Sequence, residues 1–109
     1  MLKLFLKKDK RMKVNDDSSN ITRINLIYEG EVQGVGFRYF VKKKADSLGI
    51  SGYVKNQNDG SVFVNAQGNI SAIERLTKLC QIATPNSKVK SVVKIQKPIE
   101  NIRGFRIIF

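Results

Sequence analysis

The stretch that decides the fold is RINLIYEGEVQGVGFRYFVKKKADSLG, residues 23–49. In its first part apolar and polar side chains alternate, which predicts a strand with one buried face. After a glycine-rich break at residues 33–36, apolar side chains recur at helical spacing until Gly49, a favoured residue at helix C-termini. The apolar positions are Ile24, Leu26, Tyr28 and Val32 in the strand, and Phe37, Phe40, Val41, Ala45 and Leu48 in the helix.

Downstream, residues 51–56 predict a second strand, and residues 57–60 (Gln-Asn-Asp-Gly) predict a hairpin turn. A third strand follows, and then a second helix that we expect to begin with a capping box at residues 71–74 and to end before Pro85. Alternating residues predict two more strands. The positions used are Val62, Val64 and Ala66 (third strand), Ile73, Leu76, Leu79, Cys80 and Ala83 (helix), Val89, Ser91, Val93 and Ile95 (fourth strand), and Phe105, Ile107 and Phe109 (last strand).

The order βαββαβ, with an extra C-terminal strand, predicts a ferredoxin-like α+β sandwich in which an antiparallel sheet carries two helices on one face. The 109 residues suffice for one domain. We expect residues 1–20, which hold six Lys or Arg, to be a flexible basic extension, and residues 21–109 to form the domain.

The composition narrows the chemistry. The net charge of +11 indicates an anionic partner, either nucleic acid or a small phosphorylated metabolite. The chain has no histidine, which excludes a triad or a phosphohistidine, and a single cysteine, so we expect no metal and no cofactor. Cys80 falls on the apolar side of the second helix, which favours a buried structural thiol.

No apolar run approaches the length of a membrane span, and at the start of the chain the charges follow the apolar residues, unlike in a secretory signal. We therefore expect a cytoplasmic protein without membrane contact.

The segment from Gly30 to Arg38 (GEVQGVGFR) lies between a predicted strand and a predicted helix. Its glycines allow successive backbone N–H groups to form an anion-binding concavity, and the start of the helix adds further N–H groups. Arg38 adds a planar guanidinium that matches phosphate oxygens. Alternatively, this is a tight turn followed by a surface arginine.

A second segment, residues 52–62 (GYVKNQNDGSV), places Asn56 at the end of a strand beside a turn. Its amide both donates and accepts hydrogen bonds, so it can hold a water in a fixed direction. A simpler interpretation is that Asn56 opens the turn.

Together the two segments resemble the paired sequence motifs of the acylphosphatase family, and the similarity extends from about Thr22 to Phe109. The resemblance implies hydrolysis of the carboxyl–phosphate bond of acyl phosphates without a metal or a phosphoenzyme, releasing inorganic phosphate. It implies that Arg38 and the backbone of Gln33, Gly34, Val35, Gly36 and Phe37 bind the phosphoryl group, and that Asn56 orients the attacking water. We expect a monomer.

Two positions depart from the family pattern. Glu31 stands where the family often has a basic residue, and residues 83–85 read Ala-Thr-Pro where Gly-Pro-Pro is common.

Two other functions compete with this prediction. One is a nucleic-acid-binding module, which the charge and Phe63 favour; however, residues 60–66 match the RNP1 pattern poorly and no partner aromatic stands out on the first strand, so we do not expect a nucleic-acid partner. The other is a regulatory or carbamoyl-phosphate-handling domain like the acylphosphatase-like module of hydrogenase maturation factors. Against this alternative, we expect a chain of this length to lack the other domains of those factors.

Overall fold

The computed structural model describes residues 20–109, so the extension expected at residues 1–20 lies outside the described part except for Asn20. The elements follow the predicted order. They are β2 (Ile21–Glu31), α1 (Phe37–Ser47), β3 (Ser51–Asn56), β4 (Val62–Asn69), α2 (Ile70–Gln81), β5 (Lys88–Lys97) and β6 (Phe105–Ile108).

The five described strands form one sheet in the order β5-β2-β4-β3-β6. The pairs β5–β2, β2–β4 and β4–β3 are antiparallel, as predicted, but β6 pairs with β3 in parallel, so the sheet is mixed. The direction of β6 follows from the short connection formed by residues 98–104. This connection begins and ends at the same end of the sheet, so β6 runs opposite to β5, as β3 does.

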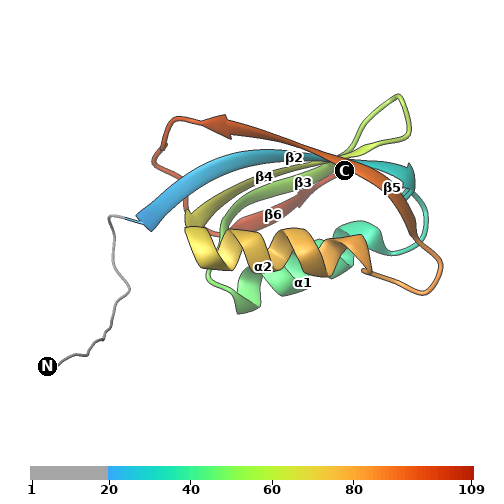
Figure 1. Cartoon of the computed structure of the whole chain (residues 1–109), viewed down its shortest axis with the longest axis horizontal. Helices are drawn as coiled ribbons and strands as arrows, with labels where there is room; N and C mark the ends of the chain where they lie inside the picture. Colours follow the sequence, from blue (N-terminus) through green and yellow to red (C-terminus); the bar gives the residue numbers. More distant parts are fainter. Residues whose placement is uncertain (1–19) are drawn as a thin grey trace, which may run out of the picture.

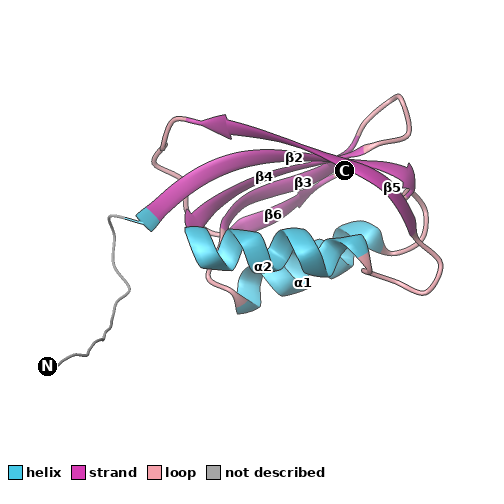
Figure 2. Ribbon diagram, viewed as in Figure 1, coloured by secondary structure: helices cyan, strands magenta, loops and turns pink. Residues whose placement is uncertain are grey.

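Both helices cover one face of the sheet (Figures 1 and 2), and the ferredoxin-like sandwich is confirmed. The core lies between the helices and this face, where apolar side chains of alternate strand positions meet those of α1 and α2. At its centre the rings of Tyr28 and Phe37 meet edge to face, with 5.3 Å between centroids. The fully buried core includes Leu26, Tyr28, Val32, Phe37, Val41, Val54, Val64, Ile73, Leu76 and Cys80.

Two local expectations are wrong. The residue that caps α2 is Asn69, whose side-chain oxygen accepts a hydrogen bond from the backbone N–H of Ser71, so the predicted capping box at residues 71–74 does not form. In β5 the strict alternation from Val89 to Ile95 is interrupted, because the register shifts by one residue opposite Glu29 and Gly30. Val89 and Val92 therefore pack against the core, whereas Val93 and Ile95 are exposed.

Within residues 20–109, none of the helices combines the length and apolar character that crossing a membrane requires.

Candidate active site

The connection between β2 and α1 is the glycine-rich segment that the sequence singled out. Gly34 and Gly36 have φ values of 75° and 81°, in the left-handed region that other residues adopt at a cost of about 1–2 kcal/mol. A Cβ atom at either position would meet nothing within 4 Å. The backbone conformation, and not a lack of space, is therefore what favours glycine here.

This connection leaves its backbone donors free. Gly36 is the N-cap of α1 and offers no side-chain cap, and the first helical hydrogen bond runs from the Phe40 N–H to the Gly36 carbonyl, at 3.1 Å. Among the described residues, no acceptor takes a hydrogen bond from the N–H groups of residues 33–39. Free N–H groups at the positive end of a helix dipole attract an anion.

Beside these donors lies a hollow of about 210 Å³ that brings the two motifs together. Asn56 reaches it from the last position of β3, and Arg38 reaches it from the first turn of α1. Arg38 is the one charged side chain that lines it among residues 20–109. The lining residues are Val32, Gly34, Gly36, Phe37, Arg38, Tyr39 and Asn56.

The end of the chain holds the Arg38 side chain. Its Nη1 donates to the Ile108 carbonyl oxygen at 3.3 Å, and its guanidinium carbon lies 5.1 Å from the centre of the Phe109 ring. The Tyr39 ring is tilted against the same Phe109 ring, with 6.5 Å between centroids. These partners could not be predicted from the sequence, because no local pattern links a residue in α1 with the last residue of β6 or with the residue that follows it.

Asn56 carries a buried polar atom. Its side-chain carbonyl oxygen is buried and has no hydrogen-bond partner among the described residues. Such atoms are rare in folded proteins and call for a functional or solvent partner. Asn56 and Arg38 line the same hollow.

Two residues of the predicted phosphate loop use their side chains elsewhere. The Gln33 amide donates to the carbonyl oxygens of Gln57 and Ser61, both at 2.8 Å, and so joins the loop to the β3–β4 hairpin. Val35 packs against the core. Of these two residues, only the backbone N–H groups are therefore available to donate hydrogen bonds to an anion.

The hairpin that follows Asn56 is itself braced. Asp59 accepts hydrogen bonds from the Ser61 hydroxyl at 2.6 Å and the Ser61 N–H at 3.0 Å. These bonds favour the charged carboxylate and lower the pKa of Asp59. The hairpin therefore holds a fixed shape next to Asn56.

The other residues of chemical interest lie outside the hollow. Cys80 is fully buried in α2, and burial raises the pKa of its thiol to about 12, which suppresses the nucleophilic thiolate. Glu31 is exposed, lies opposite Lys88 in the sheet and does not line the hollow, although its neighbour Val32 does. Within residues 20–109 no three His, Cys, Asp or Glu side chains gather where they could hold a metal ion.

Fold and hollow together define a small α+β domain in which a glycine-rich loop and one arginine lie beside unpaired backbone donors. The family model for acylphosphatase matches residues 24–107. The chain is 43% identical over 79 residues to the acylphosphatase of Thermotoga maritima, which covers 72% of this chain and 88% of that one. The chain therefore belongs to the acylphosphatase family, and it is an acylphosphatase enzyme that acts on acyl phosphates.

Solved structures agree with this assignment. An acylphosphatase from Coxiella burnetii superposes with a TM-score of 0.80 at 34% identity, over 87% of this chain and 100% of that one. HypF of T. kodakarensis superposes with a TM-score of 0.72 at 28% identity, over 81% of this chain but 12% of that one. The same fold therefore also occurs as a small part of a much longer protein.

Proposed function

We propose that the enzyme cleaves the carboxyl–phosphate bond by direct attack of a water that Asn56 holds on a phosphoryl group bound by Arg38 and the free N–H groups of residues 33–38. The observation that carries this proposal is that Arg38 and Asn56, from separate motifs, line one hollow beside unpaired backbone donors. The role of each residue follows from its chemistry.

The phosphoryl group is the part of the substrate that the loop fits. Backbone N–H groups and a guanidinium are fixed donors, and they stabilise the negative charge on the equatorial oxygens in the transition state without rearranging. The contacts of Arg38 with Ile108 and Phe109 limit its freedom before substrate binds. Less entropy is then lost when the bidentate contact forms.

In the bond-breaking step, the water oxygen attacks phosphorus while the bond from phosphorus to the acyl oxygen breaks. The carboxylate leaves with the electron pair of that bond. A carboxylate is a weak base, so it leaves without a general acid. One proton of the water passes to a phosphate oxygen, which gives inorganic phosphate, and no protein base is needed.

The first test is hydrolysis of benzoyl phosphate by the full chain in the presence of a chelator. We expect turnover to be unchanged, because every proposed contact comes from the protein. Complete loss of activity that a divalent cation restores would overturn the mechanism.

The role of Asn56 is tested by Asn56→Ala. We expect turnover to fall by about two to three orders of magnitude, the effect of removing one positioning group from a transition state. The inhibition constant of inorganic phosphate should stay nearly constant, because Asn56 is proposed to contact water.

The matched control is Asn58→Ala, because Asn58 is an exposed asparagine of the same hairpin. It should leave both quantities unchanged. If Asn56→Ala kept most of its turnover, or lost phosphate binding, the assigned role would be wrong.

A further inference from the structure

The face of the sheet opposite the helices is left open by the described residues (Figures 1 and 2). The strand register places two rows of side chains across it. One row holds Val93, Ile27, Phe63, Lys55 and Ile108, and the other holds Ile95, Asn25, Asn65, Tyr53 and Arg106. Val93 and Ile95 are 41% and 44% exposed to solvent. This open face is therefore an unpartnered surface with a mixed apolar, aromatic and cationic character.

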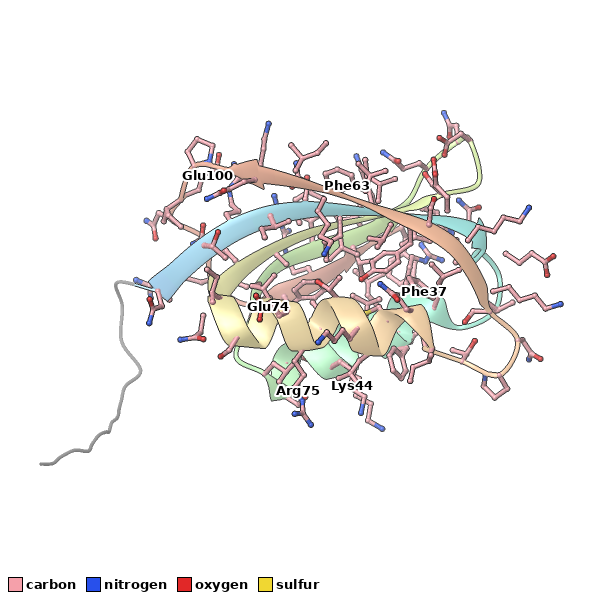
Figure 3. The ribbon with its side chains drawn as sticks, in the orientation of Figure 1. Phe37, Lys44, Phe63, Glu74, Arg75 and Glu100 are labelled. Atoms are coloured by element: carbon pink, nitrogen blue, oxygen red, sulfur yellow. The ribbon has the colours of Figure 1, made fainter. Side chains whose placement is uncertain are left out.

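Two aromatic rings stack at its centre. Tyr53 of β3 and Phe63 of β4 lie 5.9 Å apart between centroids with an angle of 29° between their planes, and both side chains are half-buried. Figure 3 shows Phe63 on the side of the sheet away from Lys44 and Arg75 of the two helices. The sequence offered Phe63 without an aromatic partner on the first strand, and the fold supplies that partner from β3.

Polar and cationic groups surround the rings. The Asn65 amide donates to the Asn25 side-chain oxygen at 3.2 Å, and the buried Asn65 oxygen has no partner among the described residues. Lys55 lies over the Phe63 ring at 5.7 Å, and Arg106 lies opposite Tyr53 in the sheet. Glu100, at the edge of this face, is paired with Arg23 at 3.3 Å, so its charge is balanced.

We propose that this open face binds single-stranded nucleic acid. Flat rings stack on unpaired bases, and Lys and Arg attract phosphates. Residues 21–109 carry a net charge of +8, which favours a polyanion. A second copy of the chain fits less well, because it would bring Lys55 and Arg106 against cations of the same kind. This surface is separate from the hollow that Arg38 and Asn56 line, because the two share no residues.

The proposal is tested by fluorescence anisotropy of the full chain with a labelled uridine 12-mer RNA, a thymidine 12-mer DNA and an RNA duplex of the same length, at 50 mM KCl and above. We expect both single strands to bind more tightly than the duplex. Tyr53→Leu and Phe63→Leu keep apolar bulk but remove the flat ring, and each should weaken single-strand binding about tenfold. Lys55→Gln should lower the salt dependence by about one unit of slope.

The chain contains a matched control. Phe40 of α1 is half-buried beneath Lys44, which lies 5.5 Å from its ring, so Phe40→Leu and Lys44→Gln make the same changes on the helix side. Both should leave binding unchanged. Hydrolysis of benzoyl phosphate and the unfolding temperature show whether each variant is folded. If Phe63→Leu does not fold, Tyr53→Leu alone tests the proposal.

Three results would overturn the proposal. One is equal loss of binding in the Phe63 and Phe40 variants, which would show that the loss does not depend on the open face. The second is duplex binding as tight as single-strand binding, which charge alone would explain. The third is a stable dimer by light scattering that Tyr53→Leu dissociates.

Discussion

The two strand-to-helix connections of this fold are built in opposite ways. The first, from β2 to α1, spans residues 32–36 and ends on Gly36, which has no side chain to cap the helix. In the second, β4 passes directly into α2, and the Asn69 oxygen accepts from the N–H of Ser71 at 2.9 Å and from its hydroxyl at 2.6 Å. The first helix start has no side-chain cap, whereas the second has a side-chain cap that satisfies one of its backbone donors.

The size of the adjoining hollows does not follow this difference. The hollow beside the start of α2 is the larger, about 650 Å³ against about 210 Å³, and it is lined by Glu74 and Arg75, which Figure 3 shows on α2. Its helix start is already capped, and a carboxylate stands beside its cations. What distinguishes the candidate active site is therefore the set of unpaired donors around one arginine, and not volume.

The largest expected effect comes from removing the arginine of the uncapped connection. Arg38→Ala should weaken phosphate binding and lower turnover by about two orders of magnitude or more, because Arg38 is proposed to contact the phosphoryl group in both the bound and the transition state. Arg38→Lys should restore only part of this, since an ammonium lacks the planar fork. Steady-state kinetics with phosphate as inhibitor measure both quantities.

Arg75→Ala, in the larger hollow, is the matched control and should behave like the unmodified enzyme. Equal losses in the Arg38 and Arg75 variants would mean that net charge, and not the uncapped connection, determines phosphate binding.

A smaller effect is expected from altering the loop backbone. Gly36→Ala places a side chain at φ 81°, which should cost about 1–2 kcal/mol of stability and turn the free N–H groups, so that phosphate binds about tenfold more weakly. Gly49→Ala is strained in the same way, at φ 70° with nothing near its Cβ, but lies at the other end of α1. Denaturant unfolding should show equal losses of stability in the Gly36→Ala and Gly49→Ala variants. Inhibition by phosphate should show weaker phosphate binding in the Gly36→Ala variant only.

Alkaline pH should lower the stability of the core, in which two buried groups, Cys80 and Tyr28, can lose a proton. Burial raises the pKa of the Cys80 thiol to about 12 and raises that of the Tyr28 hydroxyl, which donates to the Thr77 carbonyl at 3.1 Å. The folded state therefore keeps protons that the unfolded state releases. Stability should be constant below about pH 9 and then fall by up to about 1.4 kcal/mol per pH unit for each group.

Denaturant unfolding between pH 7 and 11 measures this fall. Cys80→Ala should cost about 1 kcal/mol at pH 7, reduce the alkaline slope and leave turnover intact. An unchanged slope would show that Cys80 does not contribute to it.

The smallest effect is expected at the capped connection. Asn69→Ala removes the cap of α2 and should lower the free energy of unfolding by about 1 kcal/mol. Turnover should not change, because Asn69 lies outside the smaller hollow. A fall in turnover with normal stability would contradict the division between a functional and a structural helix start.

Much of the fold follows from local patterns. The alternation before Val32, the helical spacing from Phe37 and the hairpin signal at residues 57–60 predicted the corresponding elements, because each pattern depends on neighbouring residues only. Local patterns failed to predict the cap of α2 and the buried face of β5. The sequence alone allows Asn69 to be either the last residue of β4 or the cap of α2, and the register shift in β5 depends on its pairing with β2.

The sequence by itself determined the family, the order of the elements and the residues most suited to phosphate chemistry, since glycine conformations and side-chain types are properties of the residues themselves. Only the tertiary structure decided which of them meet. Arg38 and Asn56 share a hollow because β3 ends beside the start of α1, and the last residues of the chain hold Arg38 because β6 pairs with β3. Tyr53 and Phe63 stack because β3 and β4 are paired in one particular register. Such contacts join residues distant in the chain, and the strand pairing that creates them is fixed by burial of the whole core.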